Sequence, residues 1–362
     1  MSDTVRAALL TVIDGGTLDR DQAHRAMGAV MDGESTPAQL AALLVALRMR
    51  GETVEELAGF ASAMRERVVP VDAPAGSMDV VGTGGDGSGT FNISTTAAFI
   101  VAAAGVPVAK HGNRAITSRS GSADVLDALG VRIDHDADSA AAALRSVGFA
   151  FLFAPGFHPA MQHAGPTRRE IGVRTAFNLL GPLTNPAGTR RQLVGVGDPA
   201  AAPKLAEVLR VLGTERSLVV HGAGLDELPL DGSGVIHDVT PDRVVRREVD
   251  VVALGLTPAA TARLAGGSPA ENAALVDAVL AGAERGPRRD VVLLNAGAAL
   301  IAAGRAMDLT EGIARAAAVL DSGAAMRLLA RLRAERRAAG AARAAAGGAH
   351  AATHGAHAAM EV

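Results

Sequence analysis

Residues 82–90 read Gly-Thr-Gly-Gly-Asp-Gly-Ser-Gly-Thr, a glycine-rich segment between two different kinds of chain. The mostly apolar residues 78–81, Met-Asp-Val-Val, precede it, and from Ser94 onward apolar side chains recur with helical spacing. This order of strand, glycine loop and helix suits an anion, because glycine lets amides turn toward a phosphate and the helix N-terminus adds unpaired N–H groups. We interpret residues 82–90 as a phosphate-binding loop; the alternative is a flexible surface loop.

Two other nucleotide motifs compete for the same segment. Gly82, Gly84 and Gly87 satisfy G-x-G-x-x-G, the dinucleotide fingerprint, which needs an acidic residue roughly 20 residues further on to bind ribose hydroxyls. The chain instead has Lys110 and His111 after the next predicted strand, and a lysine favours phosphate oxygens. The pattern G-x-x-x-x-G-K-[ST] is also missing from this loop, which disfavours an ordinary nucleoside triphosphatase.

Upstream of the glycine loop, the chain shows helical patterns as far as about residue 70. Thr36 stands before a proline at a first helical position, and Thr53 stands three residues before Glu56, which are two signatures of helix N-termini. We predict a small helical domain made of residues 1–72 and about 165–188.

Downstream, the pattern changes to short apolar runs separated by glycine-bearing loops and helices, which is typical of a parallel sheet. The fold class that we predict is α/β, with the small helical N-terminal domain beside a larger α/β domain, residues 73–164 and 189–338, that has a mostly parallel central sheet. The strands are expected at residues 78–81, 106–109, 149–153, 193–196 and 218–221, with a hairpin at 235–239 and 244–249.

Composition narrows the classes of function. The chain has 362 residues, a net charge of −3 and no cysteine, so thiolate metal sites and cysteine nucleophiles are excluded and a strong overall basic field for nucleic acid is absent. No apolar run reaches the roughly 18 residues that span a bilayer, and no secretory signal is evident. We expect a cytoplasmic protein without nucleic-acid or membrane partners. Residues 339–362 are rich in Ala, Gly and His, and we expect them to be disordered.

A second polar loop follows the next predicted strand. Lys110, Arg114 and Arg119 are its cations, and hydroxyl side chains are dense between residues 117 and 122. Such a concentration of donors between a strand and a helix suggests a second phosphate-binding site, with Ser120 or Ser122 capping the helix. The alternative is a well-capped turn.

At this point the residues resemble the anthranilate phosphoribosyltransferase family over roughly residues 1 to 335. The matching segments are residues 82–86, 92–95, 110–113, 121–126, 181–186 and 221–227. Pyrimidine nucleoside phosphorylases share the first glycine motif, but they should follow it with a Lys-x-Ser turn, whereas this chain has Ser88-Gly89-Thr90. Thr117 and Arg119 depart mildly from the family pattern.

The resemblance implies an enzyme of tryptophan biosynthesis that transfers phosphoribose from phosphoribosyl pyrophosphate to the amine of anthranilate, and that forms a homodimer. It also implies the residues that bind phosphoribosyl pyrophosphate: Gly82, Gly85, Asp86, Thr90, Asn92, Ile93, Ser94, Thr95, Lys110, His111, Gly112, Asn113, Arg114, Ala115, Ile116, Thr117, Ser118 and Ser122. Anthranilate would contact Gly82, Asn113 and Arg168, since a guanidinium suits its carboxylate.

Magnesium is the metal that these residues favour. It prefers oxygen ligands and substrate phosphates, and the adjacent carboxylates Asp226 and Glu227 stand in a loop-like setting; a solvated acidic pair is the alternative. By the same resemblance, Ser94 would offer its hydroxyl to a second ion. No residue is assigned as an acid or a base, because an aromatic amine already carries a free lone pair. A nucleoside phosphorylase and a non-enzymatic nucleotide-binding relative are the competing hypotheses.

Overall fold

The computed structural model describes residues 2–115 and 119–358, with side chains as far as residue 341. Four helices form the N-terminal domain: α1 Asp3–Ile13, α2 Arg20–Met31, α3 Pro37–Arg50 and α4 Val54–Arg65. The predicted N-terminus signals are confirmed, because Thr36 and Thr53 each cap a helix by accepting a hydrogen bond from the third helical residue. Two segments from later in the chain pack against this domain, α9 Gly165–Ile171 on α3 and α10 Phe177–Leu180 on α4. The domain boundaries themselves stay a prediction.

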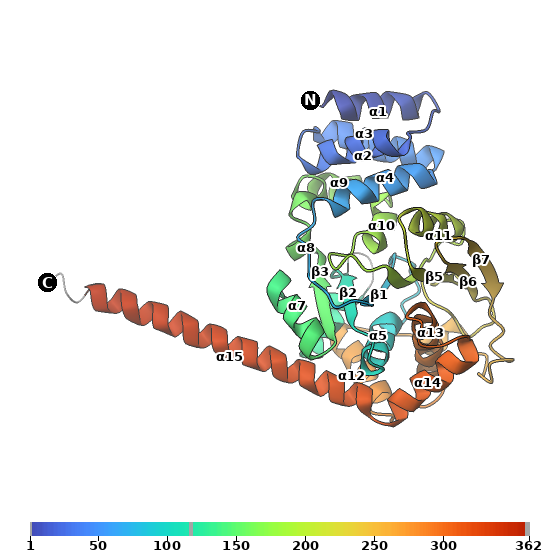
Figure 1. Cartoon of the computed structure of the whole chain (residues 1–362), viewed down its shortest axis with the longest axis vertical. Helices are drawn as coiled ribbons and strands as arrows, with labels where there is room; N and C mark the ends of the chain where they lie inside the picture. The colour runs from blue at the N-terminus through green and yellow to red at the C-terminus, as the bar shows by residue number, and fades with distance from the viewer. Residues whose placement is uncertain (1, 116–118, 359–362) are drawn as a thin grey trace.

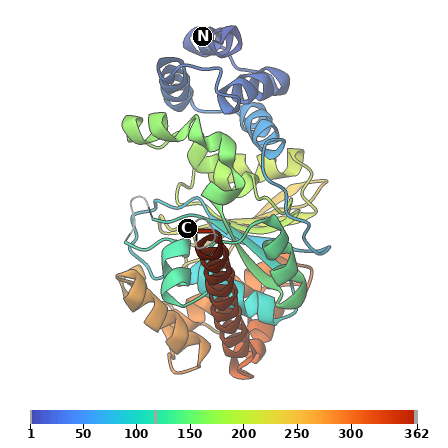
Figure 2. The same ribbon diagram turned by 90° about the vertical axis from the view of Figure 1, so that its left-hand side faces the viewer.

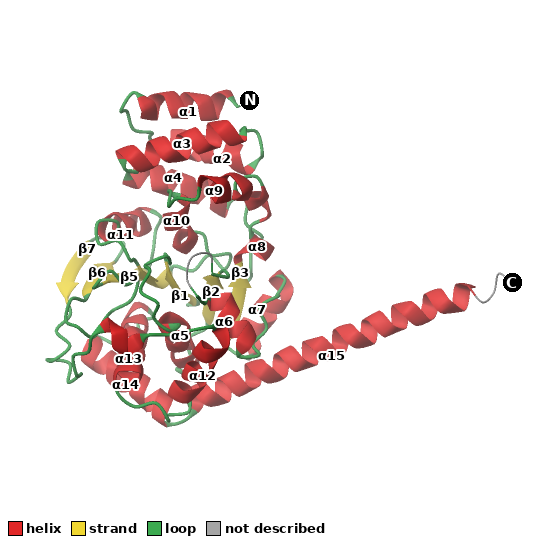
Figure 3. Ribbon diagram, turned by 180° about the vertical axis from the view of Figure 1, so that it is seen from behind, coloured by secondary structure: helices red, strands yellow, loops and turns green. Residues whose placement is uncertain are grey.

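A seven-stranded sheet forms the centre of the larger domain (Figure 3). Its strands are β1 Met78–Gly82, β2 Val108–Gly112, β3 Phe149–Phe153, β4 Arg191–Gly195, β5 Arg216–His221, β6 Val235–Val239 and β7 Val244–Glu248. Their spatial order is β3-β2-β1-β4-β5-β6-β7; the first five are parallel, and β6 and β7 are antiparallel. The predicted mostly parallel sheet and its terminal hairpin are confirmed.

Helices cover both faces of the sheet, because successive side chains along each buried strand alternate between two cores. Val80 belongs to a core shared with α5 Ile93–Ala103, α12 Pro269–Leu280, α13 Pro287–Ala302 and α14 Leu309–Asp321. Its neighbour Val81 belongs to a core that joins α11 Ala202–Val211 to the N-terminal helices. The N-terminal domain therefore stands over one face of the sheet, at the top of Figure 1. The remaining short elements are α6 Ser122–Ala128, α7 Ala137–Ser146, α8 Ala154–Phe157 and three 3-10 turns, Pro159–Gln162, Gly181–Leu183 and Thr261–Leu264.

The C-terminal segment differs from expectation. We predicted that residues 339–362 would be disordered, whereas α15, Ala324–Ala358, continues through most of them and projects from the body of the molecule (Figures 1 and 2). The physical reason is that alanine has the highest helix propensity, and extending an existing helix avoids the cost of nucleation. Residues 359–362 lie outside the described part of the chain.

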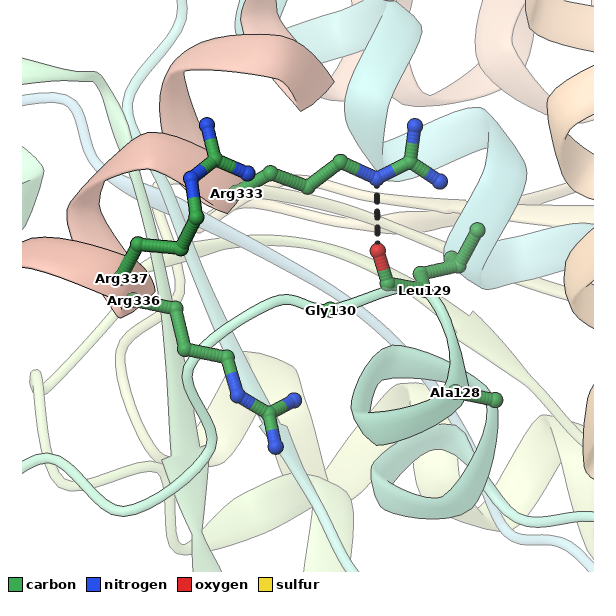
Figure 4. A pocket seen from close by; sticks show the side chains of 6 residues that line it. All are labelled: Ala128, Leu129, Gly130, Arg333, Arg336 and Arg337. Carbon is green, nitrogen blue, oxygen red and sulfur yellow. Dashed lines mark hydrogen bonds between the residues drawn. The ribbon is translucent and has the colours of Figure 1, made fainter. Parts of the chain in front are cut away.

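A pocket of about 460 Å³ lies where the start of α15 meets the end of α6 (Figure 4). Arg333 Nε donates to the carbonyl of Leu129 at 2.7 Å, and the guanidinium groups of Arg333 and Arg336 pair with Asp277 and Asp127. These contacts hold α15 on the body of the domain. Within the described residues, no helix is both long and apolar enough to cross a membrane.

Candidate active site

The sheet changes its direction of winding between β1 and β4. From β1 the chain proceeds outward through β2 and β3, and from β4 it proceeds through β5 in the other direction. In open α/β sheets, ligands bind at such a switch point, outside the carboxyl ends of the strands. The glycine-rich loop follows β1 there, and the loop that carries Asp226 and Glu227 follows β5.

The two carboxylates reach across this edge, where one accepts a hydrogen bond from the glycine loop and the other from the N-terminus of α5. The amide of Gly84 donates to Asp226 Oδ2 at 2.8 Å, and the amide of Ser94 donates to Glu227 Oε1 at 2.8 Å. A Cβ atom on Gly82 would overlap the Asp226 carboxylate, so any larger residue at that position would push the carboxylate aside. The acidic pair is therefore built into the site, which argues against a merely solvated surface pair.

Burial and mutual repulsion set the electrostatics of this pair. Burial raises the pKa of Asp226 to about 6, and the neighbouring Asp86 carboxylate adds to the rise. Burial also raises the pKa of Glu227 to about 8, with a further contribution from Asp226. Carboxylates held together under these conditions are stabilised by a cation.

The donor set fits magnesium. Hard oxygen donors converge here, and no cluster of three or more His, Asp or Glu side chains within the described residues could hold a metal ion unaided. Magnesium usually takes one or two carboxylates together with water and substrate phosphates, which is the ligand supply at this edge.

Lys110 and His111 correct one sequence prediction. We placed them in the loop after the strand, whereas β2 includes both, and both are buried. The Lys110 ammonium donates to the Val80 carbonyl, and the surrounding carboxylates, Asp79 foremost, counter the lowering of its pKa by burial. The strand continues to Gly112 because these polar side chains find partners inside the fold, so apolar content alone ended the predicted strand too early.

Asp79 is a residue that the sequence reasoning missed. It is fully buried in β1, where its Oδ2 atom accepts from the Asn185 side chain at 2.6 Å and its Oδ1 atom accepts from the His111 amide at 3.2 Å. Burial raises its pKa to about 6, and the adjacent Lys110 opposes this rise. The polar network anchors β2 and residue 185 beneath the site. An acidic residue inside an apolar run was the available signal.

Two buried histidines connect the end of β2 with the segment after β3. His111 Nε2 lies 3.2 Å from His158 Nε2, and His111 Nδ1 lies 3.2 Å from the Gly181 carbonyl. Burial lowers the pKa of His111 to about 3 and that of His158 to about 4. Both rings are therefore neutral near pH 7 and contribute hydrogen bonds rather than charge.

The second polar loop is held by an aspartate. Asp124 Oδ2 accepts from the amides of Ala115 at 2.8 Å and Gly121 at 3.0 Å, and Asp124 Oδ1 pairs with Arg114. Neither Ser120 nor Ser122 caps the helix, contrary to prediction, because Gly121 is the capping position and Asp124 reaches back to it. Ile116, Thr117 and Ser118 lie outside the described residues.

Asn92 joins the two loops. Its side-chain amide donates to the Ser120 carbonyl at 3.2 Å and its Oδ1 atom accepts from Asn272 at 2.9 Å. Ile93 and Thr95 follow it, and both side chains are buried; the Ile93 amide donates to the Phe91 carbonyl at 2.8 Å. The N-terminus of α5 thus lies between the two loops.

Arg168 occupies a separate position on α9. Its guanidinium lies 4.6 Å from the centroid of the Phe177 ring, and within the described chain it has no carboxylate partner. Burial lowers its pKa, although an arginine stays charged at neutral pH. An unpaired, half-buried cation beside an aromatic ring suits a small aromatic anion.

The structure therefore unites part of the predicted site. Gly82, Asp86, Ser94, Lys110, Asp226 and Glu227 gather at the switch point. Asn92 links this group to the second loop, but no direct contact joins Arg168 or the Asn113 side chain to it among the described residues. Arg174, which was not predicted, does contact the glycine loop: it donates to the carbonyls of Gly84 at 2.7 Å and Gly85 at 2.9 Å.

Comparisons with known proteins cover nearly the whole of this arrangement. Residues 75–326 match the α/β domain model of the glycosyl transferase family, and residues 6–68 match its helical bundle domain model. An anthranilate phosphoribosyltransferase from Roseiflexus sp. strain RS-1 is 53% identical over 330 residues, which cover 91% of this chain and 97% of that protein.

Solved structures agree with these sequence matches. The crystal structure of anthranilate phosphoribosyltransferase from Thermus thermophilus has a TM-score of 0.87 at 47% identity and covers 93% of this chain and 100% of its own. The enzyme from Saccharomyces cerevisiae in complex with PRPP and Mg has a TM-score of 0.85 at 27% identity, with coverages of 93% and 99%. Sequence and fold together show that the chain belongs to the anthranilate phosphoribosyltransferase family.

Proposed function

We propose that this protein transfers the 5-phosphoribosyl group of phosphoribosyl pyrophosphate to the amine of anthranilate, giving N-(5-phosphoribosyl)anthranilate and pyrophosphate in tryptophan biosynthesis. The observation that carries the proposal is the carboxylate pair of half-buried Asp226 and buried Glu227, hydrogen-bonded to the glycine loop and the α5 N-terminus at the switch point of the sheet. Two anthranilate phosphoribosyltransferases that are 53% and 54% identical to this chain support the choice of the two substrates.

The chemistry needs stabilisation of a leaving group more than a strong base. The amine nitrogen forms a bond to the ribose carbon, the bond from that carbon to pyrophosphate breaks, and the nitrogen then loses a proton to solvent. Negative charge develops on the departing pyrophosphate, so positioned amides and cations should supply most of the rate. The backbone amides of the glycine loop and the Lys110 ammonium are the candidate donors.

Magnesium would neutralise the pyrophosphate charge when bound. Asp226 and Glu227 would hold it directly or through water, and the Ser94 hydroxyl would serve a second ion. The raised pKa values of this acidic pair support the assignment, and the yeast relative was solved with Mg. The number of ions stays a prediction.

Arg168 would bind the anthranilate carboxylate, with Asn113 and Gly82 nearby. Its lack of a carboxylate partner in the described chain and its position over Phe177 support that role. The variant Arg168→Ala should raise the KM for anthranilate far more than the KM for phosphoribosyl pyrophosphate. Equal effects on both constants would remove the assignment.

A homodimer through the helical domain also belongs to the proposal. Large apolar side chains are exposed on the neighbouring helices α1 and α3, namely Leu10 at 51%, Ile13 at 61%, Val45 at 38% and Met49 at 83%. An apolar surface of this kind favours a partner surface of the same kind. Size-exclusion chromatography with light scattering tests it, with a mass near twice 36.5 kDa expected. The cytoplasmic location stays a prediction.

Product analysis separates this function from its nearest alternative. With magnesium, anthranilate and phosphoribosyl pyrophosphate, mass spectrometry should detect the phosphoribosyl amine, and one pyrophosphate should appear for each. Thymidine with inorganic phosphate should give no thymine. Thymine release without the amine product would establish a nucleoside phosphorylase instead.

A further inference from the structure

Arg174 contacts the glycine loop through hydrogen bonds to its backbone and not through an ion pair. It lies in the short connection between α9 and α10 and donates through one guanidinium nitrogen to the carbonyls of Gly84 at 2.7 Å and Gly85 at 2.9 Å. Among the described residues it has no carboxylate partner, so its charge is directed at two backbone carbonyls. Such charge-assisted hydrogen bonds are stronger than neutral ones.

The conformation of the loop makes this contact possible. Gly84 and Gly85 have φ angles of 64° and 65°, in the left-handed region that glycine adopts without a steric cost. Successive residues in this conformation point their carbonyl groups to the same side, where a single arginine nitrogen reaches both.

Peptide geometry then determines where the opposite groups point. In a planar trans peptide, the C=O and N–H bonds are antiparallel, so the Gly84 carbonyl shares its unit with the Gly85 amide and the Gly85 carbonyl with the Asp86 amide. Arg174 therefore holds these two amides pointing away from itself. Neither amide donates a hydrogen bond within the described residues, whereas the Gly84 amide is already bound to Asp226.

We infer that Arg174 is a positioning residue, which orients the amides of Gly85 and Asp86 toward the pyrophosphate of the substrate. The inference rests on the proposed function and names how its phosphate-binding loop is set. The Arg174 charge also polarises the two peptide units, which strengthens their amides as donors. Binding of the diphosphate ester therefore depends on Arg174, whereas binding of the acceptor amine does not.

The test compares Arg174→Ala, Arg174→Gln and Arg174→Lys with Arg169→Ala, a matched change at a neighbouring exposed arginine. Loss of the two charge-assisted contacts should raise the KM for phosphoribosyl pyrophosphate and the inhibition constant of inorganic pyrophosphate by roughly tenfold or more. The KM for anthranilate should stay within about twofold, because the acceptor does not use these amides. Arg174→Lys should recover part of the loss, and Arg169→Ala should resemble the unaltered protein.

Equal KM values for phosphoribosyl pyrophosphate in Arg174→Gln and Arg169→Ala, or a fall in kcat alone, would overturn the inference. Calorimetric titration of inorganic pyrophosphate with magnesium applies to each folded variant, so a poorly folded Arg174→Ala leaves the test intact. If the unaltered protein bound pyrophosphate but turned over no anthranilate, the proposed acceptor would be wrong. The tenfold loss of pyrophosphate affinity would then still decide the role of Arg174.

Discussion

The two loops that flank the α5 N-terminus are held in different ways. The glycine loop, residues 82–90, is anchored by distant residues: Asp226 binds the Gly84 amide from 142 positions away, and Arg174 binds the Gly84 carbonyl from 90 positions away. The second loop is anchored by Asp124, which is 9 positions from Ala115 and 3 from Gly121. Gly84 and Gly85 have no side chains for anchorage, so distant residues hold this part of the loop, whereas local hydrogen bonds such as that from the Ser88 amide to Asp86 Oδ1 at 3.1 Å hold its later part.

Because of this difference, changes to the two sets of anchors should affect different properties, substrate binding in one loop and stability in the other. Distant anchors form only when the sheet and the α9–α10 segment are in place, so changing them should affect substrate binding before stability. A local anchor forms together with α6 and should contribute mainly to stability. The following predictions test that contrast.

The largest effect is expected at Asp226. Asp226→Asn removes the charge that accepts from Gly84 and that would bind magnesium, so kcat/KM should fall by roughly 10²-fold or more. Steady-state kinetics at several magnesium concentrations measures this fall. Asp242→Asn, in the exposed turn between β6 and β7, is the control and should leave kcat/KM unchanged. A fall in kcat/KM of less than threefold in Asp226→Asn would contradict the role of Asp226 as a distant anchor that substrate binding needs.

Gly82→Ala breaks the same anchor from the other side. The new methyl group would overlap the Asp226 carboxylate and displace it from the Gly84 amide. We expect kcat/KM to fall by roughly 10- to 100-fold, as for the loss of a contact around a metal site. Gly156→Ala, where an added Cβ meets nothing within 4 Å, is the control. Unchanged kinetics in Gly82→Ala would show that the carboxylate can move without consequence.

Asp124→Asn tests the local anchor. It weakens two hydrogen bonds to loop amides and an ion pair with Arg114, so the free energy of unfolding should fall by about 1 kcal/mol. The KM for phosphoribosyl pyrophosphate should rise only about two- to fivefold, since a free-energy loss of this size corresponds to such a ratio. Urea denaturation and steady-state kinetics measure the two effects, and Asp138→Asn on the exposed side of α7 is the control. A large rise in this KM with an unchanged free energy of unfolding would contradict the assignment of Asp124 as a local, stabilising anchor.

The last prediction concerns the histidine pair below the second loop, whose effect on stability appears only at acidic pH. The folded protein lowers the pKa of His158 to about 4, so below its ordinary value of 6.5 the unfolded chain binds more protons than the folded one. The free energy of unfolding should therefore fall as pH decreases from about 6.5 toward 4, by up to about 1.4 kcal/mol per pH unit from this residue. Denaturation at pH 7 and pH 5 should show a weaker dependence in His158→Gln than in His163→Gln. Equal dependence would mean that His158 titrates alike in both states.

Most of the fold follows from local patterns. Capping by Thr36 and Thr53, the alternation of strands with helices and the 235–249 hairpin depend on neighbouring residues, and all were predicted. The end of β2 at Gly112 was not, because Lys110 and His111 belong to a strand only when Asp79 and the Gly181 carbonyl are present to bind them. The helical tail was missed because a lack of core-forming residues does not prevent an alanine-rich helix from continuing.

The site was predictable where several donors stand together in the sequence. The glycine loop, Ser94 and the pair Asp226–Glu227 carry such signals. Arg174 and Asp124 do not, since the importance of each lies in a carbonyl or amide that only the folded chain brings to it. Peptide orientation, which determines what the glycine loop can bind, cannot be inferred from composition.

Loss of anthranilate fluorescence reports the proposed transfer itself, because coupling of phosphoribose to the amine alters the fluorophore. Protein, anthranilate and phosphoribosyl pyrophosphate are mixed with and without magnesium, beside the Asp226→Asn variant. We expect a rapid loss that needs magnesium and is at least about 100-fold slower in the variant. No loss with the folded, magnesium-supplied protein, or an equal loss in Asp226→Asn, would contradict it.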